Sequence, residues 1–288
     1  MSIKSILVVV NGTEASRPAL DAAFTVANDF AAHIDVLHVR GDPRDSVPIL
    51  GEGVSGTLIE EIMDVADKES RERATRARAL YDEYGKKFDL PVAEHAAPGR
   101  ASVAWIEDTG REDEVLAKRA RLVDLIVLAR PTADGDVGST MTLNAALFDT
   151  GRPVLVVPPG FAGRAIGTRV AISWNGSTEA ARAIAGALPF IERAKDVTVV
   201  TAVGGTIAAP EEQGMLSYLG WHGVRASTHN LPSTSRIEGE VLFKDCAQMG
   251  ADLVVMGAYT RNRLRQLILG GVTRYALENA AVPLLMAH

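Results

Sequence analysis

An internal repeat constrains the fold of this chain more than any other feature of its sequence. Residues 6–20 align without gaps with residues 170–184, and in both segments an apolar run leads into an Asn-Gly turn and then a helical pattern. Both copies also end alike, with a proline followed by a short apolar run. The repeat therefore predicts two domains built on one plan, over residues 1–158 and 167–288, with a connection rich in Pro and Gly between them.

Within each copy, short aliphatic runs alternate with longer segments of helical periodicity. This alternation is typical of strands that crossover helices bury on both faces. We therefore predict an α/β fold with two tandem parallel sheets of five strands each. The expected strands lie near residues 6–10, 34–38, 92–96, 125–128 and 154–157 of the first half, and near 170–173, 197–201, 225–229, 253–256 and 283–286 of the second.

Two helices of the first half can be delimited from the residue pattern. Apolar residues between Ala19 and Ala31 recur every three or four positions, and Pro18 fits the first turn of a helix with Ser16 as its N-cap. A longer helix is expected over residues 57–87. Its predicted buried positions are Leu58, Ile62, Val65, Leu80 and Tyr84.

Charge and cysteine content limit the classes of function. Thirty Lys and Arg against 36 Asp and Glu give a net charge of -6, which provides no general attraction for nucleic acid or an anionic membrane. No apolar run approaches the length that spans a bilayer. The single Cys246 lies on the apolar face of a helical pattern, so we expect a buried thiol and a reducing compartment, the cytoplasm. The scattered histidines lack metal-ligand spacing, so we predict neither a metal site nor catalytic residues.

A first glycine motif, at residues 51–56, matches the dinucleotide-binding pattern G-x-G-x-x-G. That pattern requires a strand running directly into the glycines and a helix directly after them. Here a polar segment separates the glycines from the preceding apolar run. We therefore interpret the motif as a loop and exclude a dinucleotide-binding dehydrogenase.

A second glycine segment follows the expected strand at residues 253–256 and opens the last helix. Glycine at the end of a buried strand lets backbone approach a ligand, and a helix N-terminus offers free amides to phosphate. If the first and fourth strands of this half are neighbours, Asn175 faces Gly257 across the crevice at their carboxyl ends. The residues predicted to bind a nucleotide are Asn175, Gly257, Thr260, Gly270, Gly271 and Thr273.

These residues resemble the universal stress protein family in its tandem, two-domain form, and the resemblance covers nearly the whole chain. Its carriers are the Asn-Gly turn after the first strand, the segment from Gly257 to Thr260 followed after nine residues by Gly270-Gly271, and the closing apolar strand. The resemblance implies sheets in the order 3-2-1-4-5, as in adenine nucleotide alpha hydrolase-like folds. It also implies two halves packed as a pseudo-dimer, and ATP held through its ribose and phosphates.

The sequence departs from the family pattern at several of these positions. Asn11 and Asn175 stand where the family commonly has Asp, which removes a charge that could help to hold a metal ion. Thr260 replaces the second motif glycine, and Gly271 replaces a Ser or Thr. The corresponding segment of the first half, residues 129–144, lacks the motif glycines, and its Gly-Ser pair at 138–139 is out of register. ATP is therefore predicted in the second half alone.

Three functions remain open from the sequence. The first is a non-catalytic stress-response or signalling module that binds ATP in its second half. The alternative is a module of the same family that works through a protein partner without nucleotide, with further pairing into a homodimer. The third is a slow ATP hydrolase, which the replacement of Asp by Asn disfavours because phosphoryl transfer usually needs a carboxylate-held metal.

Overall fold

The computed structural model describes residues 2–46, 56–93, 99–132, 137–202, 209–232, 238–259 and 271–288. The first half contains β1 (Ser5–Val9), α1 (Arg17–Phe30), β2 (His33–Arg40), α2 (Gly56–Phe88), β3 (Ser102–Thr109), α3 (Glu112–Arg119), β4 (Leu125–Ala129), α4 (Val137–Asp149) and β5 (Val154–Val157). The second contains β6 (Arg169–Ser173), α5 (Thr178–Ile191), β7 (Asp196–Ala202), α6 (Ala209–Trp221), β8 (Ala226–Leu231), α7 (Glu238–Gln248), β9 (Leu253–Gly257), α9 (Val272–Asn279) and β10 (Leu284–Ala287). Short 3-10 helices lie at Glu14–Ser16, Pro43–Ser46 and Ala120–Leu122.

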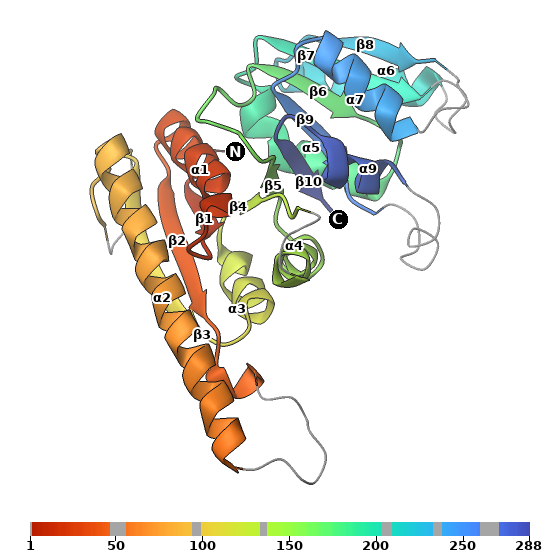
Figure 1. The fold of residues 1–288 in the computed structure, drawn as a ribbon. Helices are drawn as coiled ribbons and strands as arrows, with labels where there is room; N and C mark the ends of the chain where they lie inside the picture. The colour runs from red at the N-terminus through yellow and green to blue at the C-terminus, as the bar shows by residue number, and fades with distance from the viewer. Residues whose placement is uncertain are drawn as a thin grey trace.

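One ten-stranded sheet runs through both halves, in the order β3-β2-β1-β4-β5-β10-β9-β6-β7-β8 (Figure 1). Each half is parallel internally and has the predicted order 3-2-1-4-5, so the α/β class is confirmed. The halves join where β5 pairs antiparallel with β10, with Val156 opposite Leu284. We call this strand pair the seam. Because of it, the carboxyl ends of the strands point in opposite directions in the two halves.

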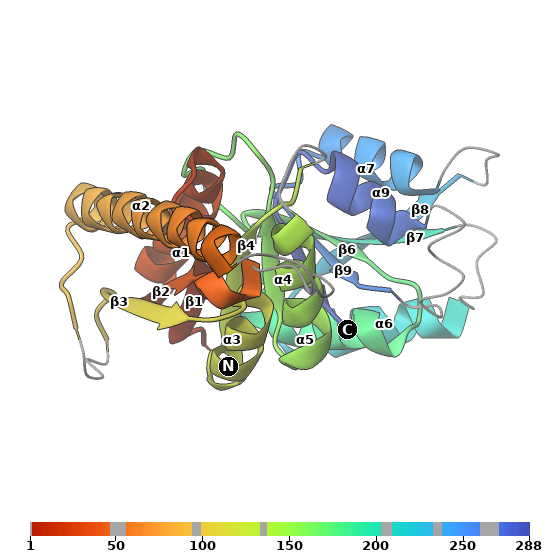
Figure 2. The same cartoon turned by 60° about the horizontal axis from the view of Figure 1, so that its bottom comes forward.

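Helices cover both faces of the sheet. One buried cluster packs α1, α2, α5 and α6 on one face, and a second packs α3, α4, α7 and α9 on the other. Across the seam, Phe30 of α1 meets Phe190 of α5 with ring centroids 5.1 Å apart. In a view from another side, α2 lies along α1 at the outer part of the first half (Figure 2). None of the helices in the described ranges is long and apolar enough to cross a membrane.

The long helix α2 is present as predicted, but only its C-terminal part is buried. Leu80 and Tyr84 lie in the core, whereas Leu58 is 46% exposed and Val65 is 68% exposed. The prediction for these two residues is wrong because α2 is about 50 Å long while β2 spans only about 26 Å. The N-terminal turns of α2 therefore extend past the carboxyl ends of the strands, where no sheet is present to cover them (Figure 1).

The third strand of the first half was also predicted in the wrong place. The expected strand at residues 92–96 is absent as far as the structure describes it: Val92 forms only an isolated bridge with Val103, and residues 94–98 lie outside the described part. The strand is instead β3, which pairs with β2 along its length. The first half of β3 is apolar over residues 103–106, whereas its second half carries the charged residues Glu107 and Asp108, which an edge strand accommodates.

Candidate functional site

The turn after β1 is held together by the side chain of Asn11. Its Oδ1 accepts hydrogen bonds from the Thr13 amide (3.1 Å), the Thr13 hydroxyl (2.7 Å) and the Ser16 hydroxyl (2.8 Å). Ser16 is the N-cap residue of α1 and Pro18 lies in the first turn, both as predicted, but the Ser16 side chain makes no capping hydrogen bond to the helix. An amide oxygen suffices for this role because the turn needs only an acceptor.

Helix α2 packs directly on this turn. Gly12 has a φ of +74°, and a Cβ at this position would collide with the backbone carbonyl of Arg73. Arg76 also donates a hydrogen bond from Nε to the Gly12 carbonyl, at 3.3 Å. The contact leaves no room for a side chain at Gly12, so the turn and α2 form one packed unit.

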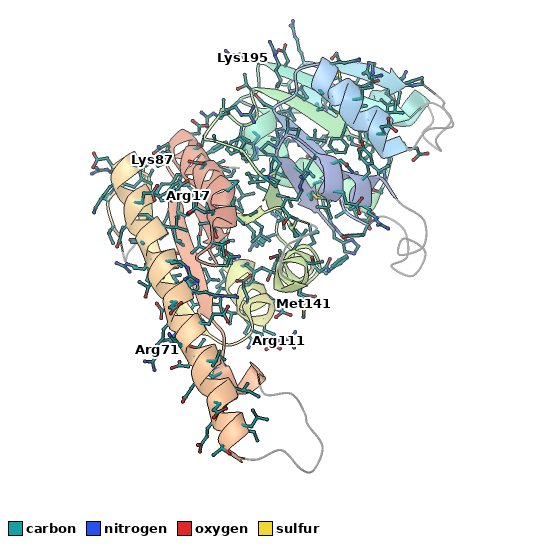
Figure 3. All side chains as sticks on the ribbon, in the orientation of Figure 1. Arg17, Arg71, Lys87, Arg111, Met141 and Lys195 are labelled. Carbon is teal, nitrogen blue, oxygen red and sulfur yellow. The ribbon has the colours of Figure 1, made fainter. Side chains whose placement is uncertain are left out.

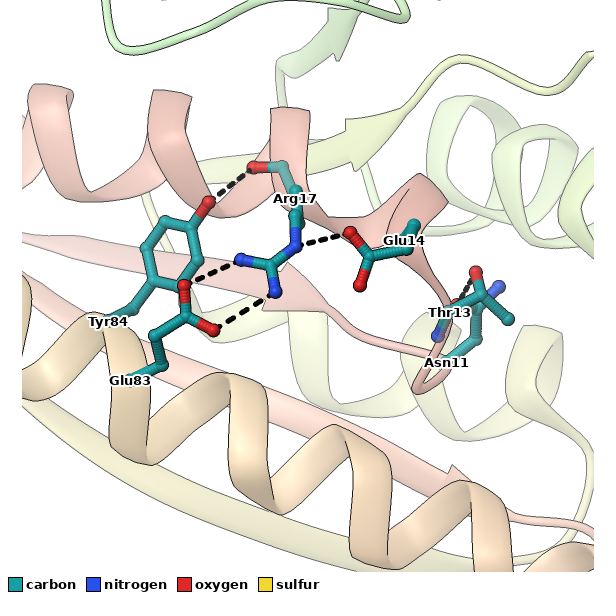
Figure 4. A network of polar contacts seen from close by, with 6 residues as sticks. All are labelled: Asn11, Thr13, Glu14, Arg17, Glu83 and Tyr84. Carbon is teal, nitrogen blue, oxygen red and sulfur yellow. Dashed lines mark hydrogen bonds and ion pairs between the residues drawn. The ribbon is translucent and has the colours of Figure 1, made fainter.

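An ion-pair network extends the same contact along α1 (Figure 4). Arg17 donates two hydrogen bonds to the Glu83 carboxylate, at 2.6 and 3.0 Å, and a further one to Glu14. The Tyr84 hydroxyl donates to the Arg17 carbonyl at 3.3 Å. Nearby, Lys87 binds Asp21 of α1 at 2.8 Å, and both basic residues lie at the contact between the helices (Figure 3).

A cavity of about 300 Å³ opens at the carboxyl edge of the first half. We call it the first-half cavity. Its lining includes Asn11 after β1, Val39 in β2 and Gly41 just after β2. Gly138 and Ser139 line it from the first turn of α4. The cavity lies at the carboxyl ends of β1 and β2, the edge at which an open parallel sheet has its ligand crevice. The sequence pattern had dismissed Gly138 and Ser139 as out of register, yet the structure brings them to this crevice.

Charged and titratable groups around this cavity are largely paired. Arg73 donates to Glu69 at 2.6 Å, and Glu112 accepts from the Thr142 hydroxyl at 2.7 Å. His38 is buried, and its Nδ1 donates to the Val10 carbonyl at 2.8 Å. Burial lowers the pKa of His38, so the ring is neutral near pH 7. The N-terminus of α4, with the Ser139 hydroxyl, is thus the part of the wall whose dipole favours an anion.

In the second half, the predicted neighbours Asn175 and Gly257 do lie close together, because β6 pairs with β9 and Ser173 is opposite Met256. Asn175 is exposed, and its Oδ1 accepts from the Ser177 amide at 3.2 Å. Gly257, however, faces the first turn of α5: a Cβ there would lie 2.6 Å from the Ala180 nitrogen. Its missing side chain lets α5 approach β9.

Gly271 and Thr273 lie together at the start of α9, on the other side of the sheet. Gly271 is the N-cap of α9, and the buried Thr273 hydroxyl accepts from the Tyr259 amide at 3.3 Å. Both line a space shared with the first half rather than with Asn175. Thr260 and Gly270 are outside the described residues. The structure therefore groups part of the predicted set but does not gather all of it around one cavity.

No cluster of three His, Cys, Asp or Glu in the part of the chain that the structure describes is arranged to hold a metal ion. Cys246 is buried, as predicted, and burial raises the pKa of its thiol to about 12.

Comparison with known proteins places this fold. A universal stress protein from Archaeoglobus fulgidus superposes with a TM-score of 0.69 at 16% identity, over 98% of this chain and 97% of that one. A functionally unknown protein from Pseudomonas aeruginosa PAO1 gives 0.56 at 16% identity, over 99% of this chain and 92% of that one. At 16% identity these similarities establish the fold alone. A search of curated proteins found no match to this sequence. The profile of the Universal stress protein family matches residues 2–136 and 239–288, more than half of the sequence. The chain belongs to the universal stress protein family.

Proposed function

We propose that this protein is a non-catalytic stress-response or signalling module of the cytoplasm that binds an adenine nucleotide. Its two domains are taken as residues 1–158 and 167–288. The observation that carries the proposal is the first-half cavity at the carboxyl ends of β1 and β2, with the N-terminus of α4 on its wall. Its volume of about 300 Å³ is at the small end of the range for ligand sites, which favours a mononucleotide over a dinucleotide.

The chemistry of the cavity assigns a role to each wall. The phosphates fit the first turn of α4, where the helix dipole and the Ser139 hydroxyl favour an anion. Arg73 is already paired with Glu69 and contributes less. The base and ribose then lie toward Asn11 and Val39, at the ends of β1 and β2.

The sequence instead predicts ATP in the second half, at Asn175, Gly257, Thr260, Gly270, Gly271 and Thr273. That site remains a competing prediction. The geometry supports it less, because α5 occupies the space beside Gly257, and Gly271 and Thr273 face the first half.

Two matched substitutions distinguish the sites. Ser139→Asp and Gly271→Asp each put a carboxylate at the start of a helix, where acidic residues favour folding, and a Cβ on Gly271 meets nothing within 4 Å. We expect ATP affinity, measured by calorimetry, to fall at least tenfold in Ser139→Asp and to stay unchanged in Gly271→Asp, since a carboxylate repels phosphate. The reverse result would place the nucleotide in the second half, and no binding by the native protein at millimolar ATP would refute the proposal. Metal-dependent ATP turnover above background would refute its non-catalytic part.

A protein partner is the second candidate function, and the projecting N-terminal turns of α2 are the observation that favours it. They carry the exposed Val65 beside acidic residues such as Glu61 and Asp64. On this alternative, Val65→Asp abolishes partner binding in a pull-down from stressed cells, while Ser139→Asp leaves it intact. A second copy of the chain would be recognised by a Val65-dependent change in sedimentation.

A further inference from the structure

A groove larger than the first-half cavity separates α4 from α9 beside the seam. Its volume is about 930 Å³, and its walls come from both halves. Arg130, Leu143 and Phe148 belong to the first half, and Tyr259, Thr273 and Leu277 to the second. We call it the interhalf groove. Helix α4 separates it from the first-half cavity: Gly138 and Ser139 face the cavity, and Thr140 and Leu143 face the groove.

One end of the groove carries the cation Arg130, which has no counter-charge among the described residues. Arg130 is half-buried, and its Nη1 donates to the Ala280 carbonyl at the C-terminus of α9, at 2.6 Å. In the part of the chain that the structure describes, no carboxylate pairs with it, and burial lowers its pKa. By contrast, Arg274 on the groove wall is paired with Glu278 at 2.7 Å. Among the described residues that line the groove, Arg130, Arg274 and Glu278 sum to one net positive charge, which belongs to Arg130 and complements one negative charge.

Apolar side chains form a continuous part of the remaining wall, beside polar residues such as Thr140 and Asn144. Leu143 and Leu277 face it from α4 and α9, and Phe148 and Tyr259 lie at its far end with ring centroids 5.3 Å apart. Arg130 binds the last turn of α9, whereas Thr273 lies in the first, so the two ends are separated by roughly 10 Å along the helix axis. A ligand that satisfies both features is long, apolar and charged at one end.

We infer that the interhalf groove binds an amphipathic monocarboxylate of medium chain length, with its acid group on Arg130 and its apolar chain between α4 and α9. Guanidinium and carboxylate match in geometry as well as charge, and the bond to Ala280 orients Arg130 before the ligand arrives. Apolar walls contribute in proportion to the chain length that they cover. The site is independent of the nucleotide site proposed above.

Decanoate is the probe, compared with decanol, which lacks the charge, and acetate, which lacks the chain. We expect decanoate to raise the melting temperature of the full chain with increasing concentration, and the other two to have at most a small effect. Arg130→Gln should weaken decanoate binding about tenfold or more, and Arg130→Lys should restore part of it. Equal stabilisation by decanol, or equal affinity in Arg130→Gln, would overturn the inference.

A second pair of variants does not touch Arg130 or the seam. Thr140→Trp fills the groove from an exposed position of α4, and Met141→Trp adds the same bulk at the next residue, which is 42% exposed and does not line the groove (Figure 3). Decanoate binding should be lost in the first and kept in the second. Retention in both would overturn the inference. ATP binding should persist in Arg130→Gln and decanoate binding in Ser139→Asp, so failure of one site is distinguishable from failure of the other.

Discussion

The two copies of the Asn-Gly turn provide an internal control for the packing of α2. Gly12 and Gly176 have nearly the same backbone, with φ of +74° and +73°, but Gly12 is buried under α2 while Gly176 is exposed. Alanine at either position takes on a left-handed conformation that costs about 1–2 kcal/mol. At Gly12 the new Cβ also meets the Arg73 carbonyl, and such crowding adds about 1–3 kcal/mol. We therefore expect losses of about 2–5 kcal/mol for Gly12→Ala and about 1–2 kcal/mol for Gly176→Ala.

Urea unfolding of both variants measures this difference in the free energy of unfolding. Amide hydrogen exchange locates it, since peptides from β1 and α2 should lose protection in Gly12→Ala and peptides from β6 and α5 in Gly176→Ala. The structural reasoning would be refuted if the two substitutions cost the same. In that case only the backbone conformation would matter, and α2 would not be seated on the first-half turn.

Three further predictions concern titratable groups. Arg17 holds the pKa of Glu83 below its ordinary value, so the stability from this pair is full at neutral pH and is lost as pH falls below 4.5. Glu83→Gln should lower the free energy of unfolding by at most about 1 kcal/mol at pH 7, because both groups are partly exposed, and a difference from the native protein that persists in acid or at high salt would contradict this. Burial lowers the pKa of His38, so below pH 6.5, its ordinary pKa, the unfolded chain binds a proton at this residue while the native chain does not, and the free energy of unfolding falls. In urea titrations His38→Asn should make the free energy of unfolding depend less on pH in this range, and an unchanged dependence would count against the prediction. Because the pKa of Cys246 is raised to about 12, iodoacetamide at pH 8 should modify the native thiol far more slowly than the urea-unfolded thiol, and equal rates would show that the thiol is accessible.

The sequence predicts a strand correctly where both faces of the strand are buried. Strands such as β1 and β4 are covered on both faces, so they read as continuous apolar runs and were predicted within a residue or two. The edge strand β3 joins a short apolar run at 103–106 to a polar second half, so its pattern differs from that of a strand buried on both faces. The helical period of α2 was evident, but its exposed first turns depend on the length of the sheet beside it, which the helix sequence does not contain.

The candidate site was predictable only in part, for a spatial reason. The Asn-Gly turns are local, and their position after the first strand of each half could be predicted directly. Gly138 and Ser139 do not match the motif because fewer residues separate them from β4 than separate Gly270-Gly271 from β9. However, α4 begins sooner after β4 than α9 does after β9, and this brings Gly138 and Ser139 to the crevice. The interhalf groove could not be predicted, since it exists only once the seam sets α4 beside α9.

The seam has a consequence for how such a chain can diverge. In a symmetric homodimer every substitution appears in both subunits, so a change that closes one site closes the other as well. Here β5 and β10 pair within a single polypeptide, so their association does not weaken on dilution and their sequences vary independently. One half can therefore cover its first turn with a long helix while its twin leaves the same turn open to solvent. The two halves can therefore evolve different sites while the pairing of β5 with β10 holds them together.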